Sequence, residues 1–100
     1  MEITTIKQDG TMTLNLAGKI TALETDDFGA ACETAVDEGV DLTLNFNDVT
    51  YIASAGLRVI MSAKKRQNTK KLKLSLINMK PEVLEVFKMT GLDEIFNINQ

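Results

Sequence analysis

Three short segments of the chain alternate strictly between apolar and polar residues, and this alternation constrains the fold more than any other feature. The apolar members are Met12, Leu14 and Leu16, then Leu42, Leu44 and Phe46, then Leu72, Leu74 and Leu76. Because successive side chains of a β-strand point to opposite sides, each segment predicts a strand with one apolar and one polar face. Strands covered by helices on both faces would be apolar at nearly every position. We therefore expect a sheet with helices mainly on one face.

The connections between these segments predict how the strands pair. Asp9-Gly10 lies between two β-prone stretches and is typical of a tight hairpin turn, so the first two strands are expected to be antiparallel. From residue 11 to residue 90 strands alternate with helical patterns, which favours right-handed parallel crossovers. The sequence therefore predicts an α/β fold in which an N-terminal β-hairpin continues into a mixed sheet of about four strands.

Three helices are expected between and after the strands. The first begins near Thr21, whose spacing to Glu24 suits a capping box. The second begins after Ser54, and the third has Pro81 in its first turn and Gly91 beyond its end. The predicted core positions are Leu23, Phe28, Cys32, Ala35 and Val36 in the first helix, Leu57, Ile60 and Met61 in the second, and Leu84 and Phe87 in the third.

Composition limits the size and the compartment. One hundred residues with 44% hydrophobic content fit one domain over residues 1–100. No apolar run is long enough to insert in a bilayer, and the N-terminus lacks the pattern of a signal peptide, so a cytoplasmic location is expected. The lone Cys32 has no disulfide partner in the chain and is interpreted as a small core residue.

The absence of histidine bears on chemistry. A Ser-His-Asp triad cannot be assembled from this chain, and the usual zinc sites lack their imidazole ligands. The six glycines are scattered and form no phosphate-binding loop. We therefore expect no catalytic residues, no metal and no cofactor, and we do not expect an enzyme.

A basic run lies between residues 64 and 73. Nucleic-acid binding is one interpretation of such a run, and a solvated helix end favoured by the helix dipole is the other. Because the chain carries a net charge of −3 and the run contains no aromatic residue, we favour the solvated helix end and expect no direct binding of nucleic acid.

Ser54 stands where a strand pattern passes through a short polar link into a helical pattern. The first amides of a helix have no partner within it, and the helix dipole leaves partial positive charge there. A hydroxyl can cap this end and a phosphate is well accommodated at it. Gly56 is expected to keep the surrounding surface open. An ordinary capping serine remains the alternative interpretation of Ser54.

This segment and three others resemble the STAS domain family, the anti-sigma-factor antagonists of bacteria and their relatives. The resemblance rests on residues 16–20, 44–49, 52–58 and 90–96. It implies the family fold and makes Ser54 the residue that a partner kinase phosphorylates, with Gly56 and Leu57 matching the Gly-Leu pair that follows. Two positions depart from the best-studied members, which have aspartate where this chain has Ala53 and Thr21.

The resemblance also implies a function. With Ser54 unmodified, the protein would bind a serine kinase/anti-sigma factor and so regulate transcription; phosphorylation would release it, and a cognate phosphatase would restore it. The candidate residues for the switch and for partner binding are Asp48, Ala53, Ala55, Gly56, Leu57 and Arg58. Arg58 lies one turn beyond Ser54 and can reach a phosphate there. Asp48 is expected to hold the following link through turn hydrogen bonds.

Two other functional classes stay open. One is a constitutive STAS-type scaffold or transporter-associated subunit without a phosphoswitch, which Ala53 favours. The other is a nucleotide-binding domain, which the missing phosphate loop disfavours. The sequence does not specify the oligomeric state.

Overall fold

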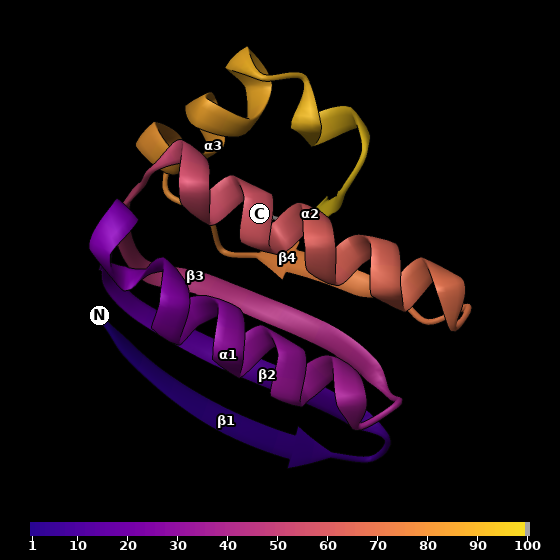
Figure 1. Cartoon of the computed structure of the whole chain (residues 1–100). Helices are drawn as coiled ribbons and strands as arrows, with labels where there is room; N and C mark the ends of the chain where they lie inside the picture. Colours follow the sequence, from indigo (N-terminus) through magenta and orange to yellow (C-terminus); the bar gives the residue numbers. More distant parts are fainter. Residues whose placement is uncertain (100) are drawn as a thin grey trace.

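The structure is a computed structural model that describes residues 1–99, and it has a mixed sheet with helices packed against it (Figure 1). The strands are β1 (Glu2–Gln8), β2 (Thr11–Ile20), β3 (Asp41–Ile52), β4 (Leu74–Ile77) and β5 (Asn97–Asn99). The helices are α1 (Thr25–Asp37), α2 (Ser54–Thr69) and α3 (Pro81–Met89), with short 3-10 turns η1 (Ala22–Glu24) and η2 (Leu92–Glu94). The strands lie in sequence order across the sheet.

The pairing of the strands follows the prediction. β1 is antiparallel to β2, and β2 to β5 are parallel neighbours. Asp9 and Gly10 both have positive φ, 50° and 78°, which is the geometry of a type I′ turn. The predicted hairpin and mixed sheet are therefore confirmed, and β5 adds a short fifth strand at the edge.

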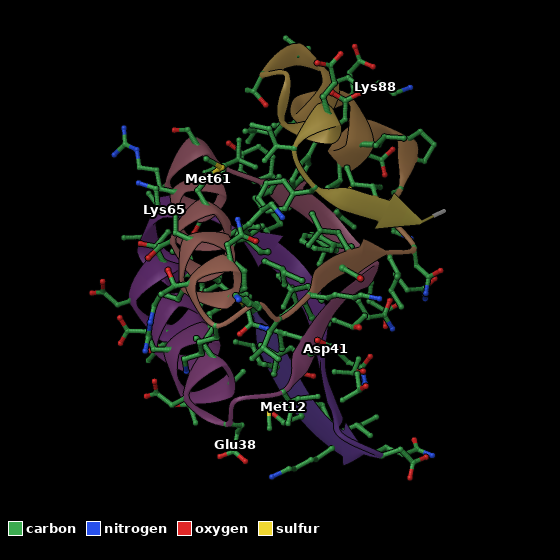
Figure 2. All side chains as sticks on the ribbon, turned by 90° about the vertical axis from the view of Figure 1, so that its right-hand side faces the viewer. Met12, Glu38, Asp41, Met61, Lys65 and Lys88 are labelled. Carbon is green, nitrogen blue, oxygen red and sulfur yellow. The ribbon has the colours of Figure 1, made fainter. Side chains whose placement is uncertain are left out.

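One face of the sheet is covered and the other is open. In Figure 2 the helices lie to one side of the sheet, while the other face carries side chains that reach outward. The alternating segments bury Met12, Leu14, Leu16, Leu42, Leu44, Phe46, Leu74 and Leu76, whereas Leu72, Thr13, Thr43 and Ser75 keep partial exposure. Each fully buried leucine contributes about 1.5–3 kcal/mol relative to exposure. The predicted register is confirmed.

β3 is longer than the sequence pattern indicates. It runs to Ile52, so the predicted polar link before Ser54 is wrong. Its pairing with β2 shifts twice, and beyond Phe46 the buried residues are Val49 and Ile52, three apart instead of two. These irregularities disguise the strand, because a bulge breaks the two-residue period.

The start of the first helix also differs from the prediction. The chain enters α1 through the 3-10 turn η1, in which the Glu24 amide donates to the Thr21 carbonyl at 3.0 Å. Thr21 makes no side-chain cap, so the expected capping box is wrong. The tighter turn places Leu23 outward with 93% of its surface exposed, so its assignment to the core is wrong as well. The other four core residues predicted in this helix are buried.

A buried amide joins the far end of α2 to the sheet. Gln67 is fully buried, and its Nε2 donates to the carbonyls of Val40 at 3.0 Å and Lys73 at 2.9 Å. The backbone carbonyl of Gln67 accepts from the Leu72 amide at 2.8 Å, which holds Leu72 in a turn. The last of the three alternating segments therefore becomes a strand only at Leu74, not at Leu72.

Candidate functional site

Ser54 lies at the first helical position of α2 and is exposed. The N-cap is Ala53, which has extended backbone angles and no side-chain cap, so the expectation that Ser54 caps the helix is wrong. The Ala53 carbonyl accepts from the amides of Gly56 at 2.9 Å and Leu57 at 3.2 Å. The amides of Ser54 and Ala55 precede these bonds and point out of the helix end.

Gly56 fixes how α2 sits on the sheet. It is buried, and a Cβ added to it would lie 2.9 Å from Ile20 Cγ2 and 2.9 Å from Ile52 Cγ1. The expectation that Gly56 opens the surface is therefore wrong, because its missing side chain instead lets the helix approach the strand ends. The Ala53 amide also donates to the Ile20 carbonyl at 2.9 Å. The backbone that carries Ser54 is thus tied to the ends of both central strands.

The remaining switch candidates divide into two groups. Leu57 is 6% exposed and faces the core, so like Gly56 it positions the helix. Ala53 and Ala55 are half-buried, and Arg58 is exposed one helical turn beyond Ser54. The first turn of α2, Ser-Ala-Gly-Leu, holds no acidic residue. An anion at Ser54 would therefore meet the free amides of the helix end, with the Arg58 guanidinium one turn away and no acidic residue in this turn.

Asp48 does not support the Ser54 segment. It lies within β3, opposite Ala17, and its carboxylate accepts from Asn47 Nδ2 at 3.1 Å. Because β3 continues to Ile52, Asp48 is about 13 Å before the end of the strand. The predicted turn role is wrong, and this separation also keeps the carboxylate out of reach of the serine hydroxyl.

An exposed apolar side chain, assigned to the core in the sequence analysis, belongs to η1, the turn that contacts α2. The Ala53 amide donates to the Ile20 carbonyl, which joins the end of β2 to the start of α2. Leu23 comes three residues after Ile20, and Ser54 comes directly after Ala53. We call Leu23, Ser54, Ala55 and Arg58 the Ser54 surface. A helical period counted from Thr21 places Leu23 inward, and only the 3-10 geometry of η1 reveals that it points out.

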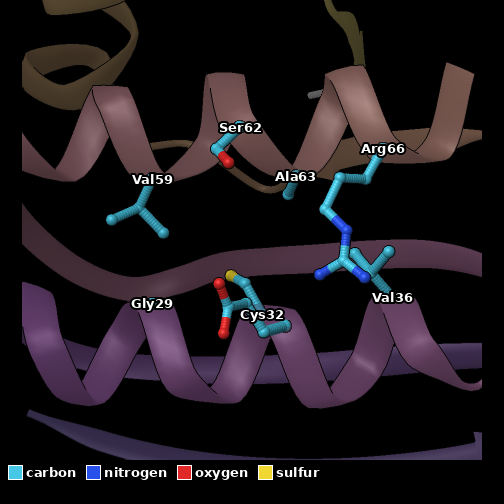
Figure 3. Close-up of a pocket in the computed structure, with 8 residues that line it drawn as sticks. Gly29, Cys32, Val36, Val59, Ser62, Ala63 and Arg66 are labelled. Atoms are coloured by element: carbon cyan, nitrogen blue, oxygen red, sulfur yellow. The ribbon is translucent and has the colours of Figure 1, made fainter. Parts of the chain in front are cut away.

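A small groove lies between α1 and α2 (Figure 3). It has a volume of about 130 Å³, and Gly29, Cys32, Val59 and Ser62 are among its lining residues. Burial raises the pKa of the Cys32 thiol to about 12, so this group stays protonated near neutral pH and is a poor nucleophile. The interpretation of Cys32 as a small core residue is confirmed by its 2% exposure.

Among residues 1–99 no three acidic or cysteine side chains gather in a way that could hold a metal ion. Within the same residues, none of the helices has the length and apolar character needed to cross a membrane.

The chain belongs to the STAS domain family, whose sequence model it matches over residues 2–100. Among similar proteins, it is 32% identical to BtrV of Bordetella bronchiseptica, a candidate anti-sigma factor antagonist, over 98% of this chain and 85% of the relative. It is 28% identical to the anti-sigma-B factor antagonist of Bacillus subtilis, over 86% of this chain and 79% of that protein.

Solved structures share the fold. An anti-sigma factor antagonist from Mycobacterium paratuberculosis superposes with a TM-score of 0.90 at 17% identity, covering 98% of this chain and 84% of that one. SpoIIAA, a cell fate determinant of Bacillus in its phosphorylated form, gives a TM-score of 0.76 at 18% identity, with 99% and 92% covered. At these identities the likeness establishes the STAS fold and no more.

Proposed function

We propose that this protein is an anti-sigma-factor antagonist that acts in the bacterial cytoplasm as a phosphorylation-controlled switch. Unmodified, it binds a serine kinase/anti-sigma factor through the Ser54 surface. Phosphorylation of Ser54 by that kinase releases it, and a cognate phosphatase restores binding. The observation that carries this proposal is the exposed Ser54 at the first position of α2, on backbone held to Ile20 and Ile52. The names of the relatives support the same class.

The physical effect of a phosphate supports a switch without refolding. Phosphorylation adds about −1.5 to −2 charges at pH 7. On the free protein this charge is stabilised by the Ser54 and Ala55 amides and by Arg58. In a docked complex the same charge would be desolvated beside Leu23, which is costly unless the partner supplies cations. The modification therefore weakens binding while the fold stays intact.

Phosphate mapping tests the acceptor. The wild type, Ser54→Ala and Ser62→Ala are incubated with the cognate kinase and ATP, and the products are mapped by mass spectrometry. Ser62 is a matched control because it is an exposed serine of the same helix, two turns further on. We expect one phosphate on the wild type and on Ser62→Ala, and none on Ser54→Ala. Phosphate retained by Ser54→Ala would contradict the proposed acceptor.

A constitutive scaffold is the second candidate, and Ala53 is the observation that favours it. An aspartate at this N-cap would supply a carboxylate next to the serine, whereas Ala53 supplies no polar group. The scaffold would bind its partner equally well with Ser54 phosphorylated or not, and Ser54→Ala would leave its binding unchanged.

A further inference from the structure

β1 forms one edge of the sheet and is left uncovered. It has seven residues, all exposed except the half-buried Ile3. In Figure 1 the strand lies beyond α1, and the helices cover the other strands. An open groove of about 260 Å³ runs beside it, lined by Thr5, Met12, Leu14, Ala30, Ala31, Thr34 and Ala35. One side of β1 therefore presents backbone groups that have no neighbouring strand.

The devices that usually protect a sheet edge are missing from this strand. Its sequence contains no proline, and its pairing with β2 runs from Glu2–Ala17 to Gln8–Thr11 without a register shift. Its one lysine, Lys7, is drawn toward α1, where Nζ contacts the Glu38 carboxylate at 2.5 Å. At the opposite edge of the described sheet, β5 is only three residues long. β1 is thus the edge suited to receiving another strand.

We propose that β1 pairs antiparallel with β1 of a second copy of this chain, about a two-fold axis perpendicular to the sheet. The two sheets then continue into one, with the helices of both copies on the same face. The centre of the strand is Ile3-Thr4-Thr5-Ile6, which is uncharged and entirely β-branched. Glu2 and Lys7 flank it with opposite charges, so antiparallel pairing places no like charges opposite each other.

Symmetry and overlap together favour two registers. Opposed residues must point to the same face, so their numbers must differ by an even amount and the axis must pass through a residue. The overlap of the seven-residue strands is greatest with the axis at Thr5, the middle residue, and the uncharged centre is used almost as fully with the axis at Thr4. A strand of seven residues is about 23 Å long. Such an interface buries on the order of 800 Å² in total, less than the roughly 1,200 Å² of stable complexes, so the dimer is expected to be weak.

Cysteine scanning locates the axis. Ile3→Cys, Thr4→Cys, Thr5→Cys and Ile6→Cys are each oxidised at high protein concentration, and the covalent dimer is quantified on a non-reducing gel. On the axis the two Cα atoms are about 4.5–5.5 Å apart, within the range that a disulfide spans. One position away they are about 8 Å apart, beyond that range. The wild type measures the background cross-linking, which should be low because its one cysteine, Cys32, is buried and has a raised pKa.

We expect one strong maximum, at Thr4 or at Thr5. Equal cross-linking at all four positions would reflect random collision and would overturn the pairing, as would no cross-linking above the wild type.

Sedimentation tests the dimer without cross-linking. Between about 10 µM and 1 mM, where an interface of this size is expected to assemble, the wild type should shift toward the dimer. Thr4→Lys places two like charges near the axis and should remain monomeric. Thr50→Lys is the matched control, because Thr50 is an exposed threonine of β3 and lies away from the β1 edge. A wild type that stays monomeric, or a Thr4→Lys variant that dimerises like the wild type, would overturn the proposal.

Discussion

At the scale of single residues, the placement of Ser54 depends on a glycine two positions further along α2. Gly56 touches Ile20 and Ile52 so closely that even a methyl group has no room. Its φ is not in the left-handed region, so steric contact and not backbone strain explains the glycine. The serine is therefore held in place by packing against the ends of β2 and β3.

Substituting Gly56 with alanine should destabilise the protein. The new Cβ would lie 2.9 Å from two isoleucine side chains, and overpacking of this kind costs about 1–3 kcal/mol. The free energy of unfolding is measured by urea titration. Gly29→Ala is the matched control, because its Cβ would meet Val59 Cγ2 at an ordinary 3.8 Å within helix α1. It should gain up to about 1 kcal/mol from helix propensity. Similar changes in the two variants would contradict the packing account.

The importance of Gly56 could be predicted only in part from the sequence. A glycine after the serine marks the segment, but its neighbours are Ile20, far away in the chain, and Ile52, which precedes the helix. Gly56 lies close to both isoleucines because β2 pairs in parallel with β3 and the chain then turns into α2. The pattern of apolar and polar residues along the sequence does not reveal these contacts.

At the scale of elements, η1 decides which side chain is exposed on the turn that contacts α2. The 3-10 turn shifts the helical phase, so Leu23 points into solvent instead of the core. Burying a leucine that is exposed in the free protein contributes about 1.5–3 kcal/mol, so a partner that covers Leu23 would bind more tightly.

Leu23→Ala should separate binding from stability. The side chain is 93% exposed, so the free energy of unfolding should change by less than about 0.5 kcal/mol. Affinity for the kinase/anti-sigma factor should fall at least tenfold, about 1.4 kcal/mol, because the partner loses an apolar anchor. Met89→Ala is the control: Met89 is also apolar and is 78% exposed, but it lies at the end of α3. Equal affinities for Leu23→Ala and wild type would exclude Leu23 from the interface.

The other end of α2 depends on Gln67. The two carbonyls that it serves belong to Val40, before β3, and to Lys73, before β4. The sequence did not reveal this role, because the residue lies within a basic run that was interpreted as solvated. The solvated interpretation holds for exposed neighbours such as Lys65, but it fails for Gln67, whose side chain faces inward.

Gln67→Leu should lower the free energy of unfolding by about 1–3 kcal/mol. Leucine fills much of the volume but leaves the Val40 carbonyl without the Gln67 donor, and an unpaired buried polar group costs about 1–3 kcal/mol. The Lys73 carbonyl keeps its bond from the Leu42 amide at 2.9 Å. Asn68→Leu, at an exposed position one residue further on, should stay within about 0.5 kcal/mol of wild type in the same urea titration. A neutral Gln67→Leu would mean that water replaces the lost donor.

At the scale of the whole molecule, the architecture could be predicted from the alternation of leucines and the Asp9-Gly10 turn. Alternation identifies strands with one covered face, and the turn determines the antiparallel hairpin. The extension of β3 to Ile52 could not be predicted, because two register shifts break the period there. β5 could not be predicted either, since three residues are too short for a pattern.

The central claim concerns the whole molecule as a switch: partner binding depends on the phosphate carried by Ser54. The most direct measurement is the dissociation constant of the kinase/anti-sigma factor for purified protein with authentic phosphoserine at position 54, compared with unmodified protein by calorimetry. Hydrogen exchange on both forms verifies that the fold is unchanged. The account predicts affinity at least tenfold weaker for the phosphorylated form, about 1.4 kcal/mol or more. Equal affinity of the two forms, with phosphate confirmed on Ser54, would contradict the switch and favour the constitutive scaffold.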